Sequence, residues 1–111
     1  MTIIDLTAVL TLNPGKLQRV LEEFDRISKF VKANEPGVLR YELTRGIPEK
    51  NGGADIVVIR EIYASEAAQQ SHLETPACQH FIKCMEGEKF CADAKIVFTQ
   101  PKVTFGFTSR L

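Results

Sequence analysis

The stretch "IVVIREIYASEAAQQSHLETP", residues 56–76, joins a strand pattern to a helix pattern and sets the framework of the domain. Its first eight residues are rich in β-branched side chains and place apolar residues on both faces of the expected strand. Ser65 follows as a predicted helix N-cap. Thr75 and Pro76 form a second helix start, so we expect two helical pieces with a bend between them.

Alternating apolar residues predict three further strands, at residues 3–12, 38–43 and 94–107. In the second of these, the alternation places Leu39, Tyr41 and Leu43 on one face. The last segment changes parity around Pro101, and a proline inside a strand is tolerated at an edge or a bulge. We therefore expect a bulged edge strand that continues beyond this proline.

A long helix is predicted between the first two strands. Asn13 is the expected N-cap and Pro14 the first helical residue, where its missing N–H costs nothing. Residues 34–37, "NEPG", end the helix. Its apolar stripe recurs at steps of three and four residues and consists of Leu17, Val20, Leu21, Phe24, Ile27 and Val31.

The element order β-α-β-β-α-β predicts a single ferredoxin-like domain of the α+β class over residues 1–111, with both helical regions on one face of a four-stranded antiparallel sheet. The other face is then left bare. Because residues 56–63 are apolar on both sides and Phe105 and Phe107 are apolar as well, we expect a second copy of the chain to cover that face. The sequence thus predicts a face-to-face homodimer.

The charge composition indicates which classes of binding partner to expect. Lys plus Arg equals Asp plus Glu at 14 each, which favours a neutral or apolar small molecule over nucleic acid or an anionic membrane. Neither a signal peptide nor an apolar run of membrane-spanning length is recognised. The three cysteines, Cys78, Cys84 and Cys91, have no CxxC spacing, so we expect no metal site and no disulfide framework. We expect a cytoplasmic protein.

A candidate site is centred on His72, which shares a helix face with the small Ala68. Tyr63 ends the preceding strand, Tyr41 lies on its neighbour, and Glu61 shares the face of Tyr63 by the period of two. A carboxylate on an apolar strand must find a donor or accept a raised pKa. These residues predict a small pocket between helix and sheet.

Each of these residues could instead have a purely structural role. His72 could be an ordinary half-buried helix residue, and both tyrosines could be core residues with one hydrogen bond each. Glu61 could pair with Arg40 or Arg60 at the sheet edge. His80 is expected to face solvent, and the cysteines are expected to be inert hydrophobes.

The segments "NEPGVLRYEL" (34–43) and "REIYASEAAQQSHLETP" (60–76) resemble the antibiotic biosynthesis monooxygenase family of dimeric α+β barrels. The resemblance extends over roughly residues 6–103. Haem-degrading members have a tryptophan at the end of the third strand, and this chain has none. The chain is instead similar to quinol-type and tailoring oxygenases, whose helix also has the S-x-x-A-x-x-x-H pattern.

The resemblance implies oxygenation without cofactor or metal, with dioxygen as co-substrate and a small aromatic, quinol or polyketide-like substrate that supplies the electrons. In this interpretation His72 is the base or orienting donor, Tyr63 and Tyr41 bind the substrate oxygen, and Glu61 sets the histidine tautomer. The substrate-binding residues would be Tyr41, Ala68, Phe24 and Phe81. An isomerase or cyclase, or a non-catalytic small-ligand-binding protein, remains the alternative.

Overall fold

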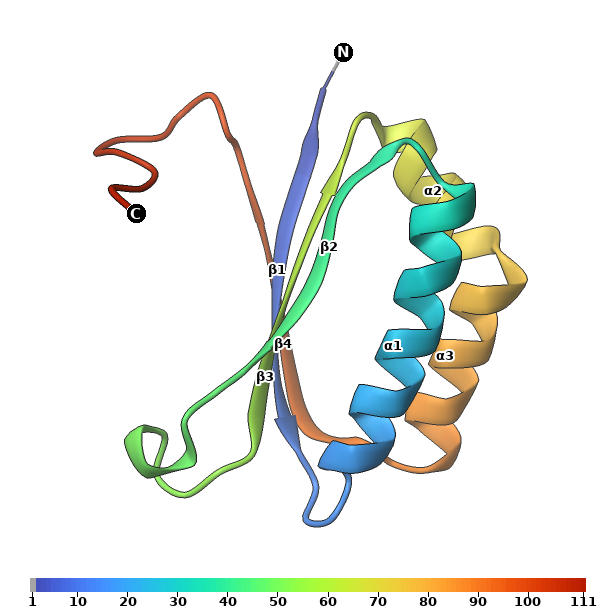
Figure 1. Ribbon diagram of the computed structural model, residues 1–111, viewed down its shortest axis with the longest axis vertical. Coiled ribbons are helices and arrows are strands. Elements are labelled where there is room, and N and C mark those ends of the chain that lie inside the picture. The colour runs from blue at the N-terminus through green and yellow to red at the C-terminus, as the bar shows by residue number, and fades with distance from the viewer. Residues whose placement is uncertain (1) are drawn as a thin grey trace.

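The computed structural model describes residues 2–111 and has four strands and three α-helices in this part of the chain. Their bounds are β1 Ile4–Leu12, α1 Leu17–Asn34, β2 Val38–Arg45, β3 Ile56–Tyr63, α2 Glu66–Glu74, α3 Pro76–Gly87 and β4 Cys91–Thr99. The strands form one antiparallel sheet in the order β2-β3-β1-β4. All three helices lie on the same side of the sheet (Figure 1). The expected ferredoxin-like α+β fold is confirmed.

The core lies between this sheet face and helices α1 and α3. Alternate residues of β1, from Leu6 to Leu12, are buried as their period of two predicts. They meet the apolar stripe of α1, whose buried members include Val20, Phe24, Ile27 and Val31. Burial of these side chains away from water stabilises the folded state by about 25 cal/mol for each Å² of apolar surface removed from water.

The second helical region is two helices, as predicted. The Ser65 hydroxyl accepts a hydrogen bond from the Ala68 amide at 3.1 Å and caps α2. The Thr75 hydroxyl accepts from the Cys78 amide at 3.1 Å and caps α3, with Pro76 in its first turn. The break between the two caps allows α2 to lie at one end of the sheet, next to β3 (Figure 1).

The predicted start of the first helix is wrong. Asn13, Pro14 and Gly15 form a turn, and α1 begins at Leu17. Gly15 has φ of +79°, a left-handed conformation that cannot belong to an α-helix. The Asn13 side chain caps nothing; its amide donates to the backbone oxygen of Lys89 at 2.8 Å.

The predicted face of Leu39 is also wrong. The pairing of β2 with β3 shifts register between Val38 and Arg40, so a bulge interrupts the alternation. Val38 therefore packs on the core beside Tyr41, while Leu39 is 57% exposed. The later part of the strand keeps the expected alternation.

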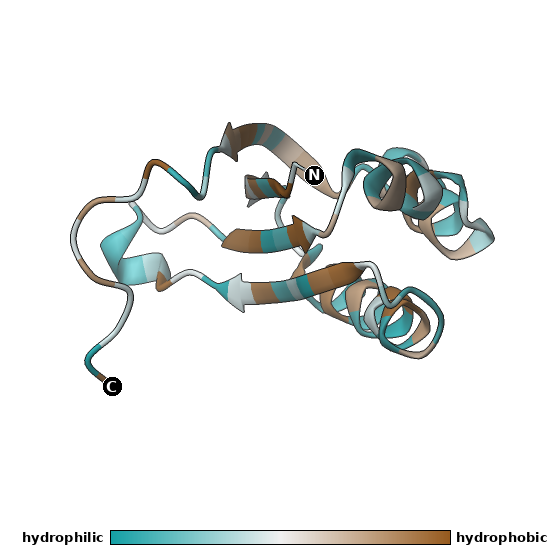
Figure 2. Ribbon diagram, turned by 90° about the horizontal axis from the view of Figure 1, so that it is seen from above, coloured by the Kyte–Doolittle hydropathy of each residue, from teal (hydrophilic) through white to brown (hydrophobic). Residues whose placement is uncertain are grey.

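The last strand is an edge strand, as predicted, but it does not continue beyond Pro101. β4 ends at Thr99, and its register shift lies near Thr11 and Leu12 of the pairing with β1. Proline has no N–H to donate to a ladder, and here the chain leaves the sheet before it. Residues 100–111 follow an irregular path on the side of the sheet opposite the helices (Figures 1 and 2).

The face opposite the helices carries half-buried apolar residues of β3 such as Val58 and Ile62. Phe105 and Phe107 of the C-terminal segment are 90% and 72% exposed. Figure 2, which views the sheet from above, separates this side from the helical layer. The homodimer that would cover it stays a prediction. None of the helices in residues 2–111 combines the length and the apolar character of a membrane span.

Candidate active site

His72 lies on the inner face of α2, and only 2% of its surface is exposed. The helix cap at Ser65 sets the start of α2, so that the seventh helical residue points back toward the sheet. Its ring lies 5.2 Å from the ring of Tyr41 and 5.6 Å from that of Tyr63, measured between centroids. The inward direction predicted for this histidine is confirmed.

The partner of His72 is Glu35, which follows the last residue of α1. Nδ1 of His72 lies 2.9 Å from Oε1 of Glu35, and both side chains are largely buried. A carboxylate oxygen accepts, so this bond requires a proton on Nδ1 of His72. The expectation that Glu61 sets the tautomer is therefore wrong.

Glu61 instead accepts a hydrogen bond from the hydroxyl of Tyr63, two residues along β3. Burial raises the pKa of the Glu61 carboxyl above its ordinary value, while the bond from Tyr63 and the nearby His72 oppose the increase. Burial also raises the pKa of Tyr63, and the Glu61 charge raises it further. This tyrosine is thus a hydrogen-bond donor rather than a source of phenolate.

Tyr41 is packed between Phe24 and His72. Its ring stacks on Phe24 with centroids 5.0 Å apart, and Phe81 meets Phe24 edge to face at 6.2 Å. Burial is the main cause that raises the pKa of the Tyr41 hydroxyl, followed by the charge of Glu61. The predicted aromatic residues therefore do come together, as a packed wall beside the histidine.

The space expected beside Ala68 is filled. Gly37, in the turn between α1 and β2, lies so close that a Cβ on it would meet Cβ of Ala68 at 2.9 Å. The Gly37 carbonyl also accepts from the Ala64 amide at 2.8 Å. The small side chain of Ala68 thus lets the turn approach α2 closely.

Four hollows on the surface of residues 2–111 are lined by residues other than His72 and Tyr63. One of about 390 Å³ lies between the end of α1 and β2, and its lining includes Glu35 and Tyr41. This volume is within the range of small-molecule sites. We call it the Glu35 hollow; two of its lining residues, Glu35 and Tyr41, are also direct neighbours of His72.

Glu35 is the residue that the sequence analysis missed. Its other oxygen, Oε2, is buried and has no hydrogen-bond partner among the described residues. One signal was available: an acid directly after a helix faces the negative end of the helix dipole and needs a donor to stabilise it. With Glu35, the site has an imidazole held by one carboxylate and a second carboxylate held by a tyrosine, an arrangement suited to proton transfer.

The His72 site does not gather three metal ligands. In residues 2–111, such a group consists of Glu23, His80 and Cys84, between α1 and α3. Cys78, which lies nearer the His72 site, is a free and buried thiol. Burial raises its pKa to about 11, as expected for an inert cysteine.

One family model matches most of the chain. The family model described as antibiotic biosynthesis monooxygenase matches residues 4–83. No curated protein matches the chain.

Several solved structures are similar over most of their length. A candidate antibiotic biosynthesis monooxygenase from Caulobacter crescentus CB15 has 28% identity and a TM-score of 0.76, with 89% of each chain covered. A second candidate of the same name, from Bacteroides thetaiotaomicron VPI-5482, has 24% identity and a TM-score of 0.75, covering 98% of this chain and 97% of its own. A protein from Pseudomonas aeruginosa has 21% identity and a TM-score of 0.74, covering 90% and 94%.

Proposed function

The chain belongs to the antibiotic biosynthesis monooxygenase family, and we propose that it is a cofactor-independent monooxygenase of a small aromatic, quinol or polyketide-like substrate. The observation that carries the proposal is the buried Glu35–His72 pair, held at 2.9 Å beside two tyrosines. Because water is excluded from such a buried pair, the charges of the pair interact strongly with a proton that is transferred from a bound substrate.

In this proposal the substrate ring lies in the Glu35 hollow, against Tyr41. The unpartnered Oε2 of Glu35 accepts the acidic proton of the substrate, which leaves Glu35 neutral and the negative charge on the substrate, while Nδ1 of His72 holds the carboxyl group in place through Oε1. Tyr63 and its partner Glu61 are positioning residues behind the histidine. The anion that remains is electron-rich enough to reduce dioxygen directly.

The electrons balance without a cofactor. For a substrate CH₂ group next to an aromatic ketone, the net change is CH₂ + O₂ → C=O + H₂O. Two C–H bonds break, one C=O bond forms, and the two hydrogens leave in water with the second oxygen atom. The substrate supplies all the electrons that dioxygen takes up, so the protein has to supply only the base and a dry environment.

The test is oxygen uptake with a panel of anthrones and quinols, comparing wild type with Glu35→Gln. Glutamine keeps an oxygen that can accept from Nδ1 of His72 but has no carboxylate oxygen to take up the substrate proton. We expect turnover to fall by about 10²- to 10⁴-fold, the usual contribution of a general base. The control is Ser71→Ala, at an exposed position of α2. Full turnover in Glu35→Gln would refute the role of the carboxylate.

A second candidate function is favoured by the burial of His72, which is 2% exposed and lines none of the hollows described above. In that case the Glu35–His72 pair only fixes the turn, and the Glu35 hollow binds a ligand without changing it. Saturable binding with no product by mass spectrometry would support this alternative. Product formed without oxygen consumption would instead indicate an isomerase or cyclase acting through the same residues.

A further inference from the structure

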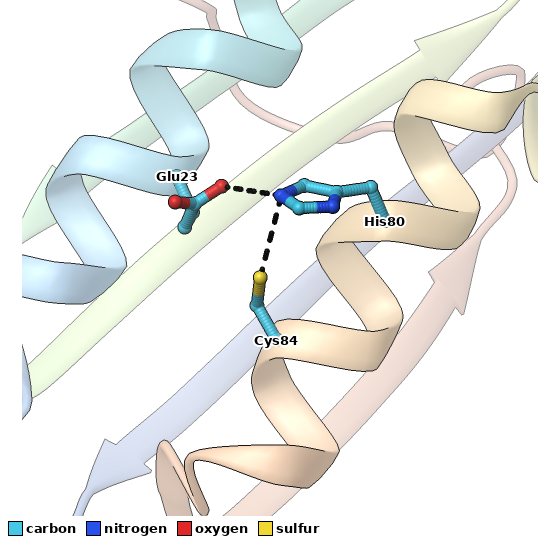
Figure 3. A group of neighbouring side chains, drawn as sticks. All are labelled: Glu23, His80 and Cys84. Atoms are coloured by element: carbon cyan, nitrogen blue, oxygen red, sulfur yellow. Dashed lines mark hydrogen bonds and ion pairs between the residues drawn. The ribbon is translucent and has the colours of Figure 1, made fainter.

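A second polar cluster lies between α1 and α3. Figure 3 shows its three side chains: Glu23 points from α1 toward His80 and Cys84 of α3. His80 and Cys84 are four residues apart, so they lie one above the other on the same helix face. Nε2 of His80 is 3.2 Å from Oε1 of Glu23 and 3.4 Å from Sγ of Cys84.

Glu23 is the unusual member of this cluster, because it is a carboxylate with only 3% of its surface exposed. Its Oε2 has an ion pair with Arg19 at 3.1 Å, but Arg19 also binds Glu88 through two nitrogens. Oε1 is buried, and its only ion-pair contact under 3.5 Å among the described residues is with Nε2 of His80 at 3.2 Å, a contact that does not meet hydrogen-bond geometry. The nearest arginine to this oxygen is Arg26, at 3.5 Å, and its side chain is 68% exposed and free to turn away. A buried oxygen of this kind is costly unless a cation binds it.

His80 alone does not satisfy the cluster. A neutral Nε2 either carries a proton and donates to the carboxylate, or accepts from the thiol, and it cannot do both. One of its two neighbours is therefore always left with a poor interaction. A metal ion between the three atoms would bind the lone pairs of all of them at once.

The spacing fits such an ion. Zn²⁺ binds oxygen and nitrogen at about 2.0–2.1 Å and sulfur at about 2.3 Å, so the ligand atoms of a tetrahedral site lie roughly 3.3–3.6 Å apart. The two measured separations, 3.2 and 3.4 Å, are close to this range, and all three atoms lie within 4.8 Å of one another. The third separation, between the ligand atoms of Cys84 and Glu23, is no more than 4.8 Å.

The cluster is also accessible. The side chain of His80 is 54% exposed, and a hollow of about 380 Å³ is lined by both His80 and Glu23. A fourth ligand, water, can enter from this side. A thiolate and an imidazole favour a borderline ion such as Zn²⁺ or Co²⁺ over Mg²⁺ or Ca²⁺.

We propose that Glu23, His80 and Cys84 bind one divalent transition-metal ion of the zinc class, with water as fourth ligand. The ion links α1 to α3 and stabilises the folded chain by mass action.

The test is titration of the reduced protein with Co²⁺, followed by the thiolate-to-cobalt charge-transfer absorption and by competition with Zn²⁺. We expect one ion per chain with a dissociation constant below about 10 µM for zinc, no competition by Mg²⁺, and a melting temperature that increases with metal. Absence of the charge-transfer band in the wild type would overturn the proposal.

Single substitutions test whether each of the three residues binds the metal ion. Cys84→Ser should remove the band, and His80→Asn and Glu23→Gln should each weaken binding by at least about tenfold. Cys91→Ser is the matched control, a half-buried cysteine outside the cluster, and should bind as the wild type does. Circular dichroism of each metal-free variant checks the fold. A band that survives Cys84→Ser, or unchanged affinity in Glu23→Gln, would show that the three residues are not the site.

Discussion

Replacing Glu35 with alanine should destabilise the protein strongly for a residue outside the apolar core. The substitution removes the acceptor of His72 Nδ1, whose ring is almost fully buried. A buried donor left without a partner costs about 1–3 kcal/mol. It also removes the unpartnered Oε2, which is a small gain. We therefore expect a loss of about 2 kcal/mol in the free energy of unfolding, or roughly 10 °C in Tm for a domain of this size.

The assay is urea denaturation at neutral pH, followed by far-UV circular dichroism. Glu35→Gln keeps an oxygen that can accept from Nδ1 and should cost about half as much as Glu35→Ala. Glu74→Ala, an exposed glutamate at the end of α2, is the matched control and should be nearly neutral. In a double-mutant cycle of Glu35→Ala with His72→Leu, which removes the Nδ1 donor, the coupling energy should be about 1 kcal/mol or more.

Two results would show that the Glu35–His72 bond does not have the expected role. If Glu35→Ala and Glu74→Ala have the same denaturation midpoint and the same m-value as the wild type, the Glu35–His72 bond does not stabilise the fold. A coupling energy near zero would show that the two side chains act independently. In either case the pair would also lose its place in the proposed proton transfer.

Three further predictions follow from other parts of the molecule. The raised pKa of Glu61 favours its protonated form in the folded state, so this stabilisation is complete below its ordinary pKa of 4.5 and is lost as pH increases through the raised value. The free energy of unfolding of the wild type should therefore decrease relative to that of Glu61→Gln as pH increases toward neutral. A difference between the two proteins that is independent of pH would contradict this. Gly37→Ala should cost about 1–3 kcal/mol through contact with Ala68, and Ala68→Gly should restore part of it; no rescue would place the strain elsewhere. Light scattering at micromolar concentration should give the mass of a homodimer, and a strict monomer would refute the expected pairing of the sheets.

The sequence by itself determined the elements and their order. A period of two marks the strands, and a period of three to four marks the stripe of α1, because each reports which side of a local segment is buried. Ser65 and Thr75 identified the two helix starts through capping that involves only neighbouring residues. The inward direction of His72 followed from the same local geometry. These features depend on residues within a few positions of one another.

Tertiary structure alone decided which distant groups meet. Glu35 and His72 are 37 positions apart, and their bond depends on how the end of α1 is rotated against α2. Local patterns hold no information on that rotation, so Glu61 was the more obvious partner. For the same reason, cysteine spacing indicated no metal site, although packing of α1 on α3 brings Glu23 to His80 and Cys84. Side chains from separate elements come together only when the whole core has packed, and core packing fixes distances that sequence periodicity does not.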